Sequence, residues 1–230
     1  MTILKENESG DFMDKQVLRD YLETGGFPVI TKKRKSYLTY EGIEDRYVYI
    51  LKKGIIKTSV ISKEGREFNL RYMNNFEIVS LFKDESSQIV DAPFNVRVES
   101  EEAHLYKIER DQFWIDVNRQ MPLQHYVKEY YRISLMYTMK KMQQMLMNGK
   151  FGAVCTQINE LYETFGRPVE EGILIDFEVT NEEIARFCGI TSASSVNRMI
   201  QRLREEQAIK MQDRKMIVTN IDLIRQNIIS

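Results

Sequence analysis

Residues 189–209 read GITSASSVNRMIQRLREEQAI, a stretch that opens with small and hydroxyl-bearing side chains and continues as a regular apolar repeat. The repeat has helical spacing, so it predicts a helix with one buried face, formed by Val196, Met199, Ile200 and Leu203. A helix buried on all sides would not need the hydroxyls, and a helix exposed on all sides would not need the apolar repeat. The stretch therefore predicts a helix that packs on one side and presents its start to a partner.

The segment before this helix predicts a second helix and a tight turn. Thr180 and Glu183 have the spacing of a capping box, so we expect a helix to begin at Asn181. The glycine that opens the quoted stretch ends it, and two helices joined by a tight glycine turn are typical of a helix-turn-helix. Residues 209–220 (IKMQDRKMIVTN) then predict a β-hairpin that turns at residues 212–214, the wing of a winged helix.

The start of the second helix is the part that enters the major groove of DNA in helix-turn-helix proteins. Hydroxyls there can contact phosphates, touch base edges or cap free backbone amides, and Thr191 or Ser192 is placed to cap. Arg198 lies four residues after Ser194 on the same face, so it is the candidate for a guanine contact. The full set of candidate DNA-contacting residues is Thr191, Ser192, Ala193, Ser194, Ser195, Arg198, Arg202, Arg214 and Lys215.

Local charge supports this interpretation without deciding it. Residues 190–215 contain six Lys and Arg and three acidic residues, a mild positive excess that suits phosphate contacts. In the alternative, the hydroxyls only cap the helix and the arginines form a solvated surface. The chain would then be an effector-binding or scaffold β-roll protein whose C-terminal domain mediates protein contacts. Salt-dependent binding to DNA distinguishes the two.

The overall composition is that of a folded protein without a globally basic surface. The chain has 230 residues, 43% hydrophobic and 29% charged, with a net charge of −1, so any contact with DNA must come from a local patch. No apolar run approaches the roughly 20 residues of a membrane span, and the N-terminus lacks a signal-peptide core. We therefore expect a cytoplasmic protein without membrane contact. Cys155 and Cys188 are expected to be buried small side chains, and two cysteines cannot supply a four-cysteine iron–sulfur site.

The N-terminal half alternates apolar and charged residues at the spacing of β-strands. Strands are predicted over residues 48–51, 55–61 and 67–73, with KKG and KEG as the turns between them. The alternation continues through residues 96–108, and no helical repeat interrupts the region. Short strands at this spacing indicate a β-roll or barrel and argue against a doubly wound nucleotide-binding sheet.

Residues 123–147 contain no glycine or proline and predict one long helix with two apolar stripes. One stripe can cover the β-roll, and the other needs a second partner, which in a homodimer is the same helix of another subunit. The alternative is a helix wrapped on both sides by its own chain. Gly149 follows as a helix stop and hinge. The candidate dimer-interface residues are Tyr126, Tyr130, Ile133, Leu135, Met139 and Met142.

Together these segments predict an α+β fold of three parts: a β-roll sensor domain (1–118), a dimerisation helix with its hinge (119–148) and a winged helix-turn-helix DNA-binding domain (149–230). No catalytic set accompanies them. His104 and His125 stand apart from any motif, whereas a metal-dependent β-roll enzyme needs clustered histidines. We therefore predict neither an enzyme nor a metal site or haem.

The order of these parts resembles the Crp/Fnr superfamily of transcription regulators over almost the whole chain, most closely its PrfA-like branch of virulence activators from Gram-positive bacteria. The resemblance rests on YLETGGF, VYILKKGIIKTSVISKEG, NLRYM, FNVRVESEEAHLYKIERDQF, NGKFGAVC and GITSASSVNRMI, the last with the glycine-to-valine spacing of that branch. It implies a cupin-like roll of the cyclic-nucleotide-binding-domain type, a homodimer on palindromic DNA, transcription activation and contact with RNA polymerase. The base-contacting positions of the family fall on Ala193, Ser194 and Arg198.

The resemblance also bears on effectors. The arginine–serine pair that holds a cyclic-nucleotide phosphate in the family would fall at residues 93–95, where neither partner is present, so no cyclic nucleotide is expected. PrfA-like proteins can be activated by glutathione in a pocket between the roll, the long helix and the DNA-binding domain. Tyr137 matches an aromatic position of that pocket and Phe165 nearly matches another, whereas Arg71 and Met73 depart from its pattern. We therefore predict a pocket for a small molecule or peptide bounded by Arg71, Met73, Tyr137 and Phe165.

Overall fold

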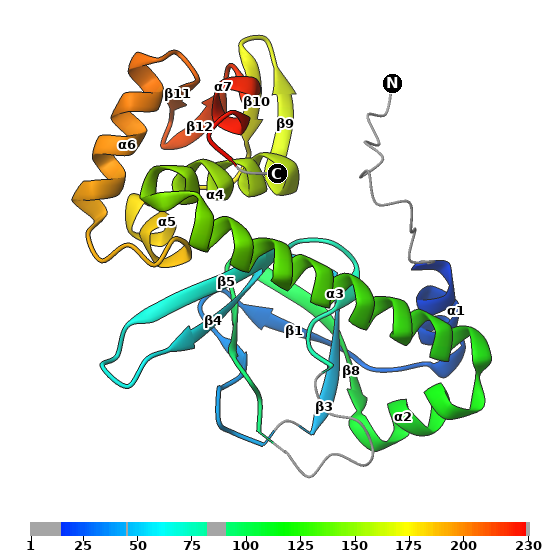
Figure 1. Cartoon of the computed structure of the whole chain (residues 1–230). Coiled ribbons are helices and arrows are strands. Elements are labelled where there is room, and N and C mark those ends of the chain that lie inside the picture. Colours follow the sequence, from blue (N-terminus) through cyan, green and yellow to red (C-terminus); the bar gives the residue numbers. More distant parts are fainter. Residues whose placement is uncertain (1–14, 45, 82–90, 229–230) are drawn as a thin grey trace.

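The computed structural model describes residues 15–44, 46–81 and 91–228, with a strand-rich N-terminal domain, a long helix lying along it and a second domain beyond the end of that helix (Figure 1). Two antiparallel four-stranded sheets form the N-terminal domain, in the orders β1-β8-β3-β6 and β2-β7-β4-β5. The predicted β-roll is therefore confirmed. Its elements are α1 (Lys15–Gly25), β1 (Val29–Lys33), β2 (Tyr37–Thr39), β3 (Tyr47–Lys53), β4 (Ile56–Ile61), β5 (Glu67–Met73), β6 (Glu77–Ile78), β7 (Asn95–Val98) and β8 (Glu102–Glu109).

A cluster of buried apolar side chains joins the two sheets of the roll, with Leu51 from one sheet and Ile56 from the other. The KKG turn between β3 and β4 depends on its glycine. Gly54 has a φ of 111°, and a Cβ there would lie 2.7 Å from the Cα of Ala103 on β8. Only glycine fits this turn, so the predicted KKG turn is present. It does not close a hairpin, because β3 and β4 belong to different sheets; the hairpin is the one that KEG closes between β4 and β5.

Helix α2 (Arg110–Arg119) leads into α3 (Met121–Met147), which confirms the predicted long helix. The first half of α3 packs on the roll. Tyr126 and Tyr130 are 2% and 9% exposed in the single chain, so they have no surface left for a dimer seam, and their assignment to the interface is wrong. The second half keeps contacts with β5 through Tyr137 and Lys141. It also exposes an apolar face made by Leu135, Met136, Met139, Met142 and Leu146.

The C-terminal domain is a winged helix-turn-helix, as predicted, with helices packed on a small antiparallel sheet of order β11-β12-β10-β9. The wing is the hairpin of β11 and β12, which turns through Asp213 and Arg214, both with positive φ. The turn lies where the sequence predicts it. The elements are α4 (Gly149–Phe165), β9 (Gly166–Val169), β10 (Gly172–Ile175), α5 (Asn181–Phe187), α6 (Ala193–Glu205), β11 (Ile209–Gln212), β12 (Lys215–Val218) and α7 (Ile221–Arg225).

The junction between α3 and α4 depends on Gly149, whose φ is 61°. We expect Gly149→Ala to lower the free energy of unfolding by about 1 kcal/mol, the cost of a left-handed conformation for a residue with a Cβ. We also expect it to change DNA affinity in the unliganded protein, because alanine disfavours the observed junction. Thermal unfolding and DNA titration test both; unchanged values would show that Gly149 does not set domain orientation. Gly152→Ala cannot serve as a second test of the junction, because a Cβ at residue 152 would lie 2.7 Å from the carbonyl oxygen of Asn227.

Candidate nucleic-acid interface

Helices α5 and α6 form the helix-turn-helix. Thr180 Oγ1 accepts a hydrogen bond from the Glu183 amide at 3.1 Å, and the Glu183 carboxylate accepts one from the Thr180 amide at 3.4 Å. The predicted capping box is therefore present. Gly189 makes the turn between the helices with a φ of 63°. The face of α6 that packs into the domain consists of Val196, Ile200 and Leu203, with Met199 partly buried.

The opposite face of α6 is open to solvent and carries Ala193, Ser194 and Arg198. Arg198 makes no hydrogen bond or ion pair with any residue that the structure describes, so its guanidinium is free to reach a base edge. The predicted hydroxyl cap is wrong. Ser192 is the N-cap residue of α6, but its Oγ lies 2.6 Å from the Oγ of Ser194 and makes no capping bond. Both hydroxyls remain at the exposed start of the helix, where a phosphate or a base can engage them.

Arg202, further along α6, is held by its own domain. Its Nε donates to the Glu206 carboxylate at 2.8 Å, and its guanidinium lies 4.0 Å from the centre of the Phe151 ring on α4. Stacking on an aromatic ring and pairing with a carboxylate both fix an arginine side chain. A DNA phosphate would have to compete with these contacts, so we assign Arg202 mainly to packing between α6 and α4.

The wing carries the two remaining basic candidates. Lys215 Nζ donates to the Asp176 carboxylate at 2.6 Å, which ties β12 to the end of β10. Arg214 lies at the turn of the wing with its side chain 86% exposed, 3.6 Å from Glu178. An ion pair this exposed contributes little, so Arg214 is the wing residue most available to a phosphate.

Comparison with known proteins identifies the family. The chain is 49% identical over 215 residues to the lactate racemization regulatory protein of Lactiplantibacillus plantarum, with 94% of this chain and 97% of that protein covered. The chain belongs to the Crp/Fnr family of transcription regulators. Residues 154–226 match the family model described as a Crp-like helix-turn-helix domain. This Crp/Fnr protein is therefore a transcription regulator with a helix-turn-helix DNA-binding domain, and this family is not a class of enzymes.

Two further comparisons agree with this family membership. The Crp/Fnr chain is 28% identical over 210 residues to the listeriolysin regulatory protein of Listeria monocytogenes, covering 90% of this chain and 88% of that one. The solved structure of FixK2 from Bradyrhizobium japonicum matches with a TM-score of 0.76 at 11% identity, over 89% of this chain and 98% of that one, which shows a shared fold. Among the described residues, no helix has the length and apolar character that crossing a membrane requires.

A cavity of about 300 Å³ lies between the roll, α3 and α4 of this Crp/Fnr regulator. Arg71 and Tyr137 line it, as predicted. Met73 and Phe165 do not, and their assignment to the pocket is wrong. Met73 is buried in the core of the roll, and Phe165 stacks on Phe177 inside the C-terminal domain with ring centres 4.6 Å apart.

Three basic side chains line this cavity, together with the carboxylates of Glu160 and Glu163: Arg71, Lys140 and Lys141. The Arg71 guanidinium lies 5.2 Å from the centre of the Tyr137 ring. Lys141 Nζ contacts Glu160 of α4 at 2.9 Å and donates to the Leu70 carbonyl of β5 at 2.7 Å, so it joins both domains to α3. Burial lowers the pKa of the Lys141 ammonium, but Glu160 and Tyr137 together outweigh burial, and the pKa lies above its ordinary value. Arg71 also pairs with Glu77 at 2.8 Å, so Arg71 and Lys141 already have carboxylate partners and the cavity is lined by charges of both signs.

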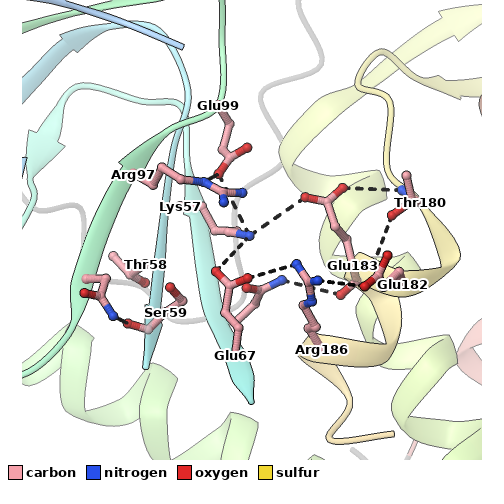
Figure 2. Close-up of polar contacts among 12 residues, drawn as sticks. Lys57, Thr58, Ser59, Glu67, Arg97, Glu99, Thr180, Glu182, Glu183 and Arg186 are labelled. Carbon is pink, nitrogen blue, oxygen red and sulfur yellow. Dashed lines mark hydrogen bonds and ion pairs between the residues drawn. The ribbon is translucent and has the colours of Figure 1, made fainter. Parts of the chain in front are cut away.

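Sequence reasoning missed a charged group between the roll and α5, which we name the roll–α5 cluster (Figure 2). The Lys57 side chain is 0% exposed, and its Nζ lies 3.3 Å from Glu67, 3.9 Å from Glu99 and 3.8 Å from Glu183. Arg186 Nη1 donates to Glu67 at 2.9 Å and completes the cluster. Burial raises the pKa of the Glu67 carboxyl, but the charges of Lys57 and Arg97 and a hydrogen bond with Ser59 together outweigh burial, and the net pKa lies below its ordinary value. The cluster joins residues of the two domains that are far apart in sequence.

The two cysteines of this Crp/Fnr regulator are expected to resist thiol reagents. Cys155 is fully buried, Cys188 is partly buried, and burial raises the pKa of each thiol to about 12. The thiolate fraction at neutral pH is then lower, by on the order of a thousandfold, than for an ordinary cysteine. Alkylation by iodoacetamide should be negligible in the folded protein and rapid in denaturant. Rapid labelling of the folded protein would show that a thiol is open to redox chemistry.

Proposed function

We propose that this regulator is a homodimeric activator of transcription that binds a palindromic double-stranded DNA operator through α6. The observation that carries the proposal is the open outer face of α6, where Arg198 is exposed and free of partners among the described residues. An arginine placed this way can bind the O6 and N7 atoms of guanine with two hydrogen bonds. The neighbouring hydroxyls of Ser192 and Ser194 supply shorter contacts to phosphates or bases.

The proposed dimer forms through the second half of α3. Leu135, Met139 and Met142 are 61%, 52% and 55% exposed in the single chain. Ile133 is only partly exposed and lies on the opposite side of the helix, with Tyr130 and Tyr137, so we leave it out of the proposed interface. An exposed apolar patch of this kind marks an interaction surface, and a two-fold axis would bring the same patch from two subunits together. The two recognition helices would then lie about one DNA turn, or about 34 Å, apart, which calls for a palindromic target.

The target genes are proposed from the relatives. Identity is higher to the protein named for lactate racemization than to the one named for listeriolysin, 49% against 28%. We therefore favour genes of lactate metabolism over virulence genes. Activation would require contact between the DNA-bound dimer and RNA polymerase.

Control is proposed to act through the cavity that Arg71 and Tyr137 line, with a small molecule or peptide as effector. The site of a cyclic-nucleotide phosphate in the family is occupied differently here. Asn95 is buried and its side-chain amide is committed to the roll, since it accepts from the Glu41 amide at 3.1 Å and donates to the Ser59 carbonyl at 3.3 Å. We propose that the protein works without a cyclic nucleotide, an iron–sulfur cluster or haem.

Titration of a labelled DNA duplex at increasing salt tests the proposed function. Binding through phosphates releases counterions, so the logarithm of the association constant should fall linearly with the logarithm of salt, with a slope of about −0.9 for each phosphate contact. Anisotropy measured between low and physiological salt gives this slope directly. A flat dependence would favour the alternative in which the C-terminal domain contacts proteins.

A further inference from the structure

Helix α5, the first helix of the DNA-binding motif, rests on strands β4 and β5 of the roll. The roll–α5 cluster supplies the charged contacts at this junction (Figure 2). Asn69 Nδ2 of β5 also reaches the Glu183 carbonyl at 3.5 Å, and Asn74 Nδ2, just after β5, donates to the Thr164 carbonyl of α4 at 2.7 Å. Contacts from one strand of the roll therefore hold two helices of the DNA-binding domain.

The apolar part of the junction consists mainly of one buried side chain from the roll, with partly buried Ile55 packed against the same cluster. Tyr72 of β5 is 8% exposed and packs inside the core cluster of the C-terminal domain. Its ring centre lies 5.7, 5.1 and 4.9 Å from those of Phe165, Phe177 and Phe187. Aromatic burial of this kind stabilises the docked domain, while ion pairs that are buried add more to its geometry than to its stability.

Most charges at the junction also have a partner in their own domain, whereas the ion pair of Glu183 is with Lys57 of the roll. On the roll, Arg97 Nε donates to Glu99 at 2.7 Å, and on α5, Arg186 Nη2 donates to Glu182 at 2.7 Å. Lys57 retains the roll carboxylates whether or not α5 is docked. Separation of the domains would break the Lys57–Glu183 and Arg186–Glu67 pairs, after which Lys57 and Glu67 would still have each other and Glu183 would lose its ion pair.

We propose that the roll–α5 cluster positions the recognition helix for operator binding, with Lys57 and Glu67 as positioning residues in the roll. This inference rests on the proposed function. Docking leaves the outer face of α6 open, since Ser194 and Arg198 stay exposed. A dimer must present two such helices at a fixed separation, and the apparent affinity falls in proportion to the fraction of molecules in the competent arrangement. Docking on the roll places a larger fraction of molecules in the competent arrangement than a connection through Gly149 alone would.

Arg186→Glu tests the proposal, because it sets a carboxylate against Glu67 without changing the roll. Arg225→Glu is the matched control. It makes the same charge change in the same domain, and Arg225 pairs with Glu163 of α4 and not with the roll. If the docked fraction falls to about a tenth, Arg186→Glu should weaken specific binding roughly tenfold more than the control does. Hydrogen exchange of the full-length dimer without DNA should also become faster at α5 and β5.

A second substitution separates positioning from general destabilisation. Glu67→Gln alone should weaken binding slightly, but in the Arg186→Glu background it should restore affinity and protection from exchange, because it removes the facing carboxylate. Equal affinities for Arg186→Glu and Arg225→Glu, unchanged exchange at α5 and β5, or further loss on adding Glu67→Gln would each overturn the proposal. A wild-type protein that binds no DNA would refute the proposed function. The hydrogen-exchange rates of α5 and β5 would still show whether α5 docks on the roll.

Discussion

Replacing Arg198 with alanine is expected to weaken binding to the specific operator by about 1–3 kcal/mol and to relax selectivity at one base pair of each half-site. Arg198 is exposed one helical turn beyond Ser194, on the side of α6 opposite the buried Val196 and Ile200. Because it has no other partner among the described residues, its loss should leave the fold unchanged. Affinities for the operator and for each single-base variant measure the effect.

Arg204→Ala is the control for this prediction. Arg204 is exposed on the same helix, and its Nη1 donates only to Gln201 at 3.2 Å among the described residues. Its loss should weaken binding to all sequences about equally, as expected for a residue that acts through charge alone. Equal selectivity in wild type and Arg198→Ala would mean that α6 docks on DNA through another face.

A charge in the second half of α3 is expected to separate the dimer. Leu135 is 61% exposed in the single chain and belongs to the apolar face proposed for the interface. Leu135→Asp would bury an unpaired carboxylate between subunits, which costs several kcal/mol. Sedimentation should show a shift to monomer with an unchanged thermal transition at high dilution. A fully dimeric Leu135→Asp protein would place the interface elsewhere.

Tyr130→Asp should give a different result because Tyr130 is buried against the roll of its own chain. We expect a lower melting temperature, since the carboxylate would lie inside the cluster that joins α3 to α1 and α2. Comparison of the two variants distinguishes the face of α3 that holds the roll from the face that holds the partner subunit.

Local signals in the sequence predict most of the DNA-binding motif. The Thr180–Glu183 capping box, the turn at Gly189 and the wing at residues 212–214 each depend on residues close together in the chain, and the structure contains all three. Helical spacing also predicts α3. It cannot say which stripe meets the roll and which meets a partner, because both stripes are apolar, and this is why Tyr126 was assigned to the wrong face.

Contacts between the domains could not be predicted in the same way. Glu67 and Arg186 are 119 residues apart in the chain, and Asn69 and Glu183 are 114 apart, so no local pattern connects them. Lys57 gave no signal because it lies within four consecutive buried residues of β4, where strand alternation fails. Only Arg71 and Tyr137 of the four predicted residues line the pocket, for a related reason. The side chains that line a space between two domains depend on how those domains dock.

Selection of DNA from a random library by the wild-type protein tests the central claim most directly. We expect enrichment of a palindrome whose two half-sites lie about 34 Å, one helical turn, apart, as two copies of α6 related by a two-fold axis require. Recovery of no enriched sequence, or of one unrepeated half-site, would contradict it.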